Sequence, residues 1–314
     1  MLVIAAPGQG AQTPGFLAPW LEDPAAAERL ARYAEATELD LVHFGTEADA
    51  DTIRDTAVAQ PLLVAAALVA GAAIDADAPG PDLLTGHSVG ELAAAGLSGA
   101  VTDTDTMVLV RERGRAMAEA AALTPTGMTA VLGGDRGEVL ATLGRHGLTP
   151  ANDNGPGQIV AAGTTEQLAA LAGDPPARAR IIPLSVAGAF HTEHMGSAVA
   201  HLAEVAGGIT ARTPSTPLLS NRDGEVVSDG DEVIARIVGQ IANPVRWDLC
   251  MEAMLARGVT GLLELPPAGT LTGIARRALK GVDTFALKTP DQLDDAIAFC
   301  RAHAGSGPAE GEDR

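Results

Sequence analysis

The sequence contains few aromatic side chains. Aromatic residues make up 3% of its 314 residues, although apolar residues of all kinds make up 46%. A hydrophobic core must therefore be built from Ala, Val, Leu and Ile, a composition that suits Ala-rich helices packed closely against a sheet. The length allows one large domain, or a large domain that carries a smaller insertion.

Basic residues are also scarce. The chain has 21 Lys and Arg against 40 Asp and Glu, so its formal net charge is −19. This balance excludes nucleic acid as a partner, because so few cations cannot neutralise a row of phosphates. Where the basic residues gather is informative for the same reason, and they form two groups, within residues 111–115 and within residues 276–280.

Cysteine occurs only at Cys250 and Cys300. Two cysteines cannot form a disulfide framework, and each lies in an apolar, helix-like setting, so we predict buried thiols in a reducing compartment. Residues 1–6 lack the basic segment of a signal peptide, and the longest apolar run, residues 62–74, has 13 residues and is shorter than a bilayer span. We therefore predict a cytoplasmic protein that does not bind a membrane.

Short apolar runs separated by turn signals predict an α/β fold with a parallel sheet. Residues 2–6 form an apolar run stopped by Pro-Gly, as in a buried parallel strand, and residues 83–85 predict a second strand. A long Ala-rich helix is expected to begin at residues 60–61, because Pro is accepted in a first helical turn. An amphipathic helix is expected over residues 105–122.

The pattern changes after residue 126 to short strands alternating with short helices. The predicted order is βαββαβ, with strands at 128–132, 148–152, 158–162 and 180–184 and helices at 136–145 and 165–171. This is the order of a ferredoxin-like unit. We therefore predict a ferredoxin-like subdomain over residues 126–186, inserted in a discontinuous α/β-hydrolase-like core of residues 1–125 and 187–303. Residues 304–314 have no apolar face and are predicted to form a disordered tail.

Ser88 is the most informative residue of the chain. It lies in a G-x-S-x-G pattern, residues 86–90, between the second predicted strand and an Ala-rich segment. In such an elbow the serine backbone is strained, and glycines flank it because a side chain there would collide with the neighbouring strand or helix. The pattern predicts an exposed, nucleophilic hydroxyl.

A serine hydroxyl needs a base, because it is a weak nucleophile at neutral pH. His87 adjoins the serine but projects from a neighbouring backbone position, so we do not expect it to reach the hydroxyl. Three histidines after the predicted insertion remain as candidates, and composition alone does not separate them: His191, His194 and His201.

Glycines 8 and 10 flank Gln9 at the end of the first predicted strand. A dinucleotide-binding G-x-G-x-x-G pattern is excluded because its third glycine would fall at Thr13. The glycines instead let the backbone approach a ligand and present N–H groups at the sheet edge, which is the geometry of an oxyanion hole.

These residues resemble a known family, the malonyl-CoA:acyl-carrier-protein transacylases of fatty acid synthesis, which are related to the acyltransferase domains of polyketide synthases. Four separated motifs match in order: residues 7–12 (PGQGAQ), 86–91 (GHSVGE), 113–114 (RG) and 188–191 (GAFH). Further matches are residues 60–61 (QP), 152–158 (NDNGPGQ) and 240–247 (QIANPVRW). The resemblance covers about residues 1–280.

The resemblance implies a role for each matched catalytic position. Ser88 would be the acylated nucleophile and His191 its base. The backbone N–H groups of Gln9 and Val89 would form the oxyanion hole. The backbone carbonyl of Gln240 would orient the histidine in place of an Asp, because a neutral acceptor still fixes the Nδ1–H tautomer.

The resemblance also implies the substrate-binding residues. Arg113 would hold the malonyl carboxylate through a planar two-point fork, which lysine could not imitate. Phe190 would leave little room for a methyl branch on the acyl group. The matching motifs add Gln60 and Asn154 to the substrate-binding set.

The implied reaction transfers a malonyl group from malonyl-CoA to the phosphopantetheine thiol of an acyl carrier protein, through a malonyl-serine intermediate and with ping-pong kinetics. No bound cofactor or metal is implied, and we expect a monomer. Such carrier proteins are acidic, so docking on this acidic chain needs a local basic patch. Arg276, Arg277 and Lys280 are the candidates, with Arg178 and Arg180 as rivals.

Two alternatives stay open. The elbow alone would also suit a serine hydrolase, which would hydrolyse simple esters without a need for Arg113. A protein that binds a carrier without turnover would leave Ser88 unlabelled by malonyl-CoA. One departure from the family pattern is residues 264–269 (ELPPAG), where relatives often have a glycine-rich turn, so this loop is expected to differ in detail.

Overall fold

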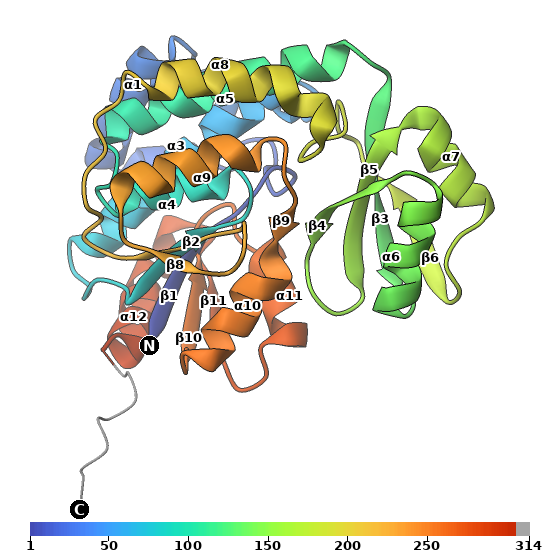
Figure 1. The fold of residues 1–314 in the computed structure, drawn as a ribbon. Helices are drawn as coiled ribbons and strands as arrows, with labels where there is room; N and C mark the ends of the chain where they lie inside the picture. Colours follow the sequence, from blue (N-terminus) through green and yellow to red (C-terminus); the bar gives the residue numbers. More distant parts are fainter. Residues whose placement is uncertain (306–314) are drawn as a thin grey trace, which may run out of the picture.

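The computed structural model describes residues 1–305, which form a large α/β unit beside a smaller one (Figure 1). From residue 306 onward, the predicted tail lies outside the described residues. The large unit contains a six-stranded sheet in the order β11-β10-β1-β2-β7-β8. Its strands are β1 (Leu2–Ala6), β2 (Leu83–Gly86), β7 (Leu218–Leu219), β8 (Val226–Val227), β10 (Gly261–Glu264) and β11 (Asp283–Ala286).

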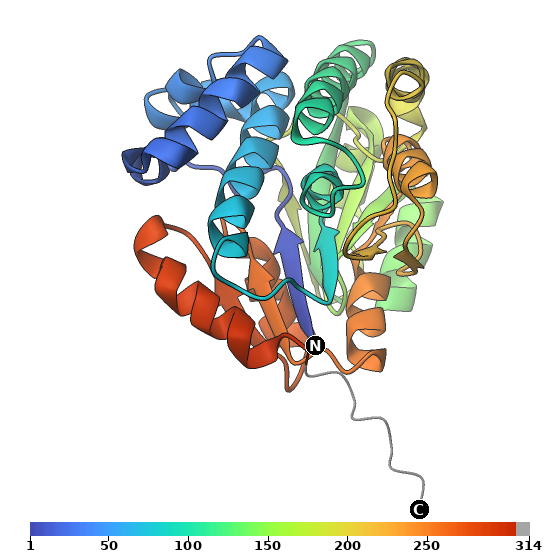
Figure 2. The ribbon, with the colours of Figure 1, turned by 90° about the vertical axis from the view of Figure 1, so that its left-hand side faces the viewer.

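The predicted parallel sheet is confirmed, because every pair of neighbours from β11 to β7 is parallel and only β8 runs antiparallel. All five residues of β1 are buried. Leu2, Ile4 and Ala6 belong to one hydrophobic cluster, and Val3 and Ala5 belong to another. Because side chains alternate along a strand, β1 contributes to two hydrophobic cores, one on each face of the sheet. Helices flank the sheet on both sides (Figure 2).

The helices of the large unit are mostly rich in alanine. They are α1 (Pro24–Thr37), α2 (Leu41–Thr46), α3 (Thr56–Asp75), α4 (Gly90–Leu97), α5 (Asp103–Ala122), α8 (Gly196–Ala206), α9 (Gly230–Gln240), α10 (Trp247–Ala256), α11 (Thr270–Ala278) and α12 (Leu293–His303). Both cysteines are buried free thiols, as predicted.

Helix α3 begins earlier than predicted. It starts at Thr56, because the Asp55 side chain accepts a hydrogen bond from the N–H of Ala57 and caps the first turn, so Pro61 lies inside the helix. Among residues 1–305, this is the one helix long and apolar enough to cross a membrane by length and composition. The rest of the protein buries 78% of its apolar window.

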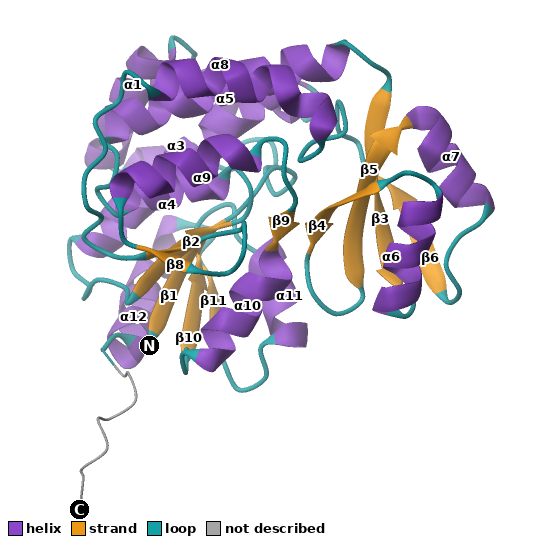
Figure 3. Cartoon of the chain, in the orientation of Figure 1, coloured by secondary structure: helices purple, strands orange, loops and turns teal. Residues whose placement is uncertain are grey.

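The smaller unit has the predicted βαββαβ order. Its elements are β3 (Thr126–Gly133), α6 (Arg136–Arg145), β4 (Thr149–Asp153), β5 (Gln158–Thr164), α7 (Thr165–Gly173) and β6 (Ala179–Pro183). They form an antiparallel sheet in the order β6-β3-β5-β4, with both helices on one face (Figure 3). The short strand β9 (Val245–Arg246) pairs with β4 and joins the two units. The boundaries at residues 126 and 186 stay a prediction.

Candidate active site

Ser88 lies on the sharp turn between β2 and α4. Its φ is +54°, a left-handed conformation that is costly for a residue with a side chain. A Cβ on Gly86 would overlap the backbone of Gly90, and a Cβ on Gly90 would overlap the carbonyl of Ala6 in β1. The predicted strand-turn-helix elbow is therefore present, and its two glycines are required by close backbone contacts.

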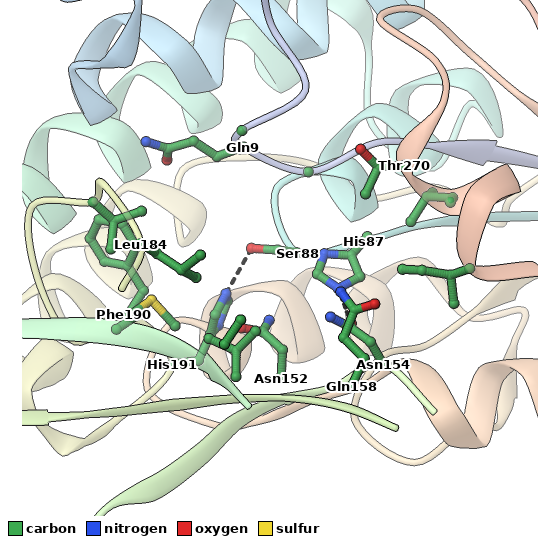
Figure 4. Close-up of a pocket in the computed structure, with 18 of the residues that line it drawn as sticks. Gln9, His87, Ser88, Asn152, Asn154, Gln158, Leu184, Phe190, His191 and Thr270 are labelled. Atoms are coloured by element: carbon green, nitrogen blue, oxygen red, sulfur yellow. Dashed lines mark hydrogen bonds between the residues drawn. The ribbon is translucent and has the colours of Figure 1, made fainter. Parts of the chain in front are cut away.

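His191 is the histidine that the structure brings to Ser88. The Ser88 Oγ lies 2.7 Å from His191 Nε2 (Figure 4). On the other side of the ring, His191 Nδ1 lies 2.8 Å from the backbone oxygen of Gln240. Because a carbonyl only accepts, Nδ1 carries the proton and Nε2 is free to accept from the serine hydroxyl. His201 instead pairs with Glu112 at an exposed position. His194 is half-buried in the short 3-10 helix Glu193–Met195, just after His191.

Burial keeps the imidazole of His191 neutral. Desolvation and the nearby charge of Arg113 lower the pKa of His191 to about 3, although its hydrogen bond to Gln240 opposes the shift. A neutral imidazole can accept a proton from Ser88 at every pH well above that value. The pair therefore has the geometry and the protonation state of a nucleophile with its base.

Arg113 reaches the same point from α5 and is fully buried. Its Nη1 donates to Gln60 Oε1 at 2.6 Å, and its Nη2 donates to Gln240 Oε1 at 2.8 Å and lies 3.5 Å from Ser88 Oγ. Its Nε has no hydrogen-bond partner among the described residues. Burial lowers the pKa of Arg113 to about 10, so it remains a cation at neutral pH. The guanidinium is held by two neutral amides and places its positive charge beside the serine hydroxyl.

The two predicted oxyanion donors flank the cavity. Gln9 follows β1, and its side chain turns away to bond the Arg54 carbonyl and the Thr56 hydroxyl, both at 3.3 Å. Val89 follows Ser88 directly. Within residues 1–305, no acceptor is assigned to the backbone N–H of Gln9 or of Val89. Both donors are thus available to a ligand.

A cavity of about 250 Å³ lies between the two units and opens onto Ser88. The large unit contributes the elbow and Phe190, which is 6% exposed, and the small unit contributes β3, β4 and β5 side chains. Asn154 lies in this wall, and its Oδ1 is 2.8 Å from Nε2 of the half-buried His87 (Figure 4). Among residues 1–305, no group of three or more His, Cys, Asp or Glu side chains is placed to hold a metal ion.

The first predicted docking group lies at the rim of this cavity. The first turns of α11 line the cavity, and Arg276 and Arg277 are exposed further along the same helix, with Lys280 just beyond it. Arg277 donates to the side chain of Gln158, a cavity residue of the small unit, at 2.9 Å. The rival group at Arg178 and Arg180 is exposed next to and on strand β6.

The loop that departs from the family pattern supports α11. Glu264 is fully buried, and its carboxylate accepts backbone N–H groups from Gly269, Leu271 and Thr272 at 2.8 to 2.9 Å. A carboxylate at a helix N-terminus satisfies donors that would otherwise have no partner. The altered loop therefore still fixes the helix that lines the cavity.

Two residues under the elbow were given no role by the sequence analysis. Asn221 is fully buried, and its side chain accepts from the N–H of Ser88 at 2.8 Å and donates to the carbonyl of Gly86 at 2.8 Å. Glu91 ends the matched motif of residues 86–91 and is 6% exposed. Its place in that motif was the available signal, whereas nothing in the sequence marks Asn221.

Comparisons with known proteins agree with this geometry. The acyl transferase domain family matches residues 5–293. A malonyl CoA-acyl carrier protein transacylase from Mycobacterium tuberculosis is 49% identical over 298 residues, which cover 94% of this chain and 99% of the relative. The crystal structure of MCAT from Mycobacterium tuberculosis superimposes with a TM-score of 0.92 at 48% identity, covering 95% of this chain and 99% of that one.

A further solved structure shows a malonyl-transacylase in complex with a type II PKS acyl-carrier protein. It matches with a TM-score of 0.88 and 28% identity, and covers 95% of this chain and 99% of that one. The similarity to all of these proteins runs through both the large and the small unit of the chain.

Proposed function

Because the chain belongs to the acyl transferase family, and within it to the malonyl CoA-acyl carrier protein transacylases, we propose that it transfers a malonyl group from malonyl-CoA to the phosphopantetheine thiol of an acyl carrier protein. The observation that carries this proposal is the contact between Ser88 and His191 beside the buried cation of Arg113. A hydrolase of simple esters would have no use for such a cation.

In the first half-reaction, malonyl-CoA enters the cavity with its carboxylate on Arg113. Two donors on one planar guanidinium match a carboxylate, and release of the Gln60 or Gln240 amide would free them. His191 takes the proton of Ser88 as its oxygen attacks the thioester carbonyl. The N–H groups of Gln9 and Val89 bond the resulting oxyanion, at about 3 kcal/mol for each donor.

The first half-reaction ends with the acyl-enzyme. The tetrahedral intermediate collapses, CoA leaves with the proton from His191, and malonyl remains as an ester on Ser88. In the second half-reaction, the phosphopantetheine thiol gives its proton to His191 as its sulfur attacks that ester. The second tetrahedral intermediate then collapses to the malonyl thioester of the carrier, and the Ser88 oxygen leaves with the proton from His191. This sequence requires ping-pong kinetics, because CoA leaves before the carrier reacts.

The acyl group is selected by charge and by shape. Arg113 favours an acyl group that ends in a carboxylate. Phe190 lies in the wall next to His191 and limits the room for a branch. Gln60 positions Arg113, and Asn154 fixes His87 on the opposite side of the cavity. The chain works without a bound cofactor, as a monomer, in the cytoplasm.

The carrier docks at the rim of the cavity through Arg276, Arg277 and Lys280. Acidic residues of the carrier would meet these cations while its flexible arm enters between the units. A fatty acid carrier and a polyketide carrier present the same arm and thiol, so both are substrates to try.

Steady-state transfer of radiolabelled malonyl from malonyl-CoA to holo carrier protein tests the proposed function. We expect parallel double-reciprocal lines when both substrates are varied, and no transfer to apo carrier, which has no thiol. Intersecting lines, or release of free malonate at the rate of malonyl-CoA consumption, would contradict a ping-pong transferase.

A further inference from the structure

Glu91 lies beneath the elbow, on the side away from the cavity. It is the second residue of α4, and both of its carboxylate oxygens are occupied by donors. Oε1 accepts from the backbone N–H of Asn221 at 2.5 Å, and Oε2 accepts from the side-chain amide of Gln240. The carboxylate therefore fixes two residues that are 19 positions apart in the sequence.

Those two residues hold the nucleophile by its backbone. The Asn221 side chain accepts from the N–H of Ser88 at 2.8 Å, and the Gln240 side chain donates to the carbonyl oxygen of Ser88 at 3.1 Å. Ser88 needs such support because its positive φ is unfavourable. We call Glu91, Asn221 and Gln240 the elbow clamp.

We propose that Glu91, in its ionised form, is a positioning residue that orients the Gln240 amide and, through the elbow clamp, holds Ser88 for attack. This inference rests on the proposed role of Ser88 as the nucleophile. Glu91 touches neither substrate nor the reacting atoms.

The charge state of Glu91 decides the orientation of Gln240. With an ionised Glu91, the Gln240 NH₂ group faces the carboxylate and its oxygen faces Arg113 Nη2. If Glu91 is protonated, its carboxyl O–H becomes a hydrogen-bond donor. It then faces two further donors, the Asn221 N–H and the Gln240 NH₂ group, which already point at this carboxyl group. Rotation of the Gln240 amide would relieve that conflict, but it would turn NH₂ toward Arg113 and remove the donor from the Ser88 carbonyl.

Glu91 can change its charge state near neutral pH. Burial raises the pKa of Glu91 to about 7, against the opposing effects of its hydrogen bonds and of Arg113 and Arg236. Arg113 on α5 and Arg236 on α9 are cations throughout this range, and Cys250 on α10 has a pKa raised well above its usual value. His191 titrates near 3. Burial lowers the pKa of His87, the residue before Ser88, below its usual value. Glu91 is thus the carboxyl group at the elbow whose pKa is raised toward neutrality.

The experiment measures sulfonylation of Ser88 by phenylmethanesulfonyl fluoride between pH 5.5 and 8.5, by intact mass. This uncharged reagent reports on Ser88 without a need for Arg113 or malonyl-CoA. In the native chain we expect the rate to rise about 20-fold with pH, with a midpoint near 7. Glu91→Gln should lower the rate at pH 8 about 100-fold and abolish the rise with pH. In either orientation of the new glutamine amide, its NH₂ group would face one of the two donors, the Asn221 N–H or the Gln240 NH₂ group.

Two variants make the result specific. Glu91→Asp keeps the charge on a shorter side chain, so we expect a lower plateau but the same rise with pH. Glu112→Gln is the matched control, because that carboxylate lies on α5 and bonds Arg111 and His201 outside the elbow. It should behave like the native chain. If Glu91→Gln does not fold, the pH dependence of sulfonylation in the native chain and in Glu91→Asp still tests whether ionisation of the residue at position 91 controls Ser88.

A native rate at pH 8 in Glu91→Gln, or a rise with pH that survives in this variant, would overturn the proposal. So would a native chain or a Glu91→Asp variant with no rise near pH 7. A native chain that is sulfonylated but takes no malonyl from malonyl-CoA would contradict the proposed function alone. A Ser88 inert to the reagent at every pH would overturn both.

Discussion

The large and the small unit contribute unequally to the site. Among residues 1–305, every group with a hydrogen bond to Ser88 comes from the large unit: His191, Arg113, Asn221, Gln240 and the backbone N–H of Glu91. The small unit contributes a wall of the cavity and the partner of His87. Bond making is thus organised around one edge of the large sheet, whereas the small unit governs what reaches that edge. Changes in the large unit should therefore abolish chemistry, and changes in the small unit should alter binding.

Removal of the nucleophile should have the largest effect. Ser88→Ala leaves no atom to carry the acyl group, so transfer should fall about 10⁵-fold, as measured by malonyl transfer to holo carrier. Ser197→Ala removes an exposed hydroxyl on α8 and is the matched control, which should retain full activity. Residual transfer within about tenfold of the native rate would place the acyl group elsewhere.

Arg113→Lys should be the next most severe change. Lysine keeps the charge but cannot donate to Gln60, Gln240 and a carboxylate with one planar group, so kcat/KM for malonyl-CoA should fall about 10²-fold to 10³-fold. Sulfonylation of Ser88 should change far less. Arg111→Lys is the control, because Arg111 pairs with Glu38 and Glu112 at the surface of the same helix. Equal losses in both assays would show that Arg113 supports the elbow rather than the substrate.

Glu91 should make stability and activity respond oppositely to pH. Its pKa rises from 4.5 to about 7 on folding, so its contribution to stability is fully present below pH 4.5 and is lost as pH increases through 7. The lost contribution is about 3 kcal/mol. Denaturant unfolding of the native chain and of Glu91→Gln should therefore give a stability difference that shifts in favour of the variant between pH 4.5 and 7.5. A pH-independent difference would contradict the raised pKa.

Charge reversal at the rim should affect one substrate only. Arg276→Glu with Arg277→Glu should raise the KM for carrier protein about tenfold and leave the KM for malonyl-CoA unchanged, since the patch meets the carrier alone. Arg178→Glu with Arg180→Glu tests the rival patch, and Arg257→Glu, at an exposed end of α10, controls for added negative charge. An equal increase in KM for both substrates would refute the docking surface.

A change in the small unit should have the smallest effect on chemistry. Asn154→Ala leaves Nε2 of the half-buried His87 without its partner in the protein, which costs about 1 kcal/mol. We expect kcat/KM for malonyl-CoA to fall about tenfold while Ser88 sulfonylation stays within about twofold of the native rate. A parallel loss in both measurements would mean that the small unit also organises the nucleophile.

The sequence predicted those parts of the site that are local in the chain. The strand, the elbow and its glycines lie within residues 83–90, where apolar and glycine patterns report directly on the backbone. The βαββαβ order of the small unit followed from the same kind of pattern. The start of α3 was predicted too late, because the cap at Asp55 was not recognised.

The remaining parts depend on contacts between distant residues. Asn221 bonds Ser88 across 133 positions, and Gln240 bonds it across 152. No hydrophobic periodicity or turn signal in the sequence marks such pairs. The family resemblance predicted the role of the Gln240 backbone carbonyl, but it did not predict the contacts of the Gln240 side chain. Strand β9 was missed for a similar reason, because two residues acquire a strand conformation only by pairing with β4.

Malonyl transfer through Ser88 is tested most directly by intact-protein mass spectrometry after brief mixing with malonyl-CoA, followed by addition of holo carrier protein. We predict a malonyl-sized adduct on the native chain that is absent from Ser88→Ala, weak in Arg113→Lys, and transferred to the carrier within the mixing time. An absent adduct, or one that is lost to water at the same rate with and without the carrier, would contradict the assignment of this chain as a malonyl transferase acting through Ser88.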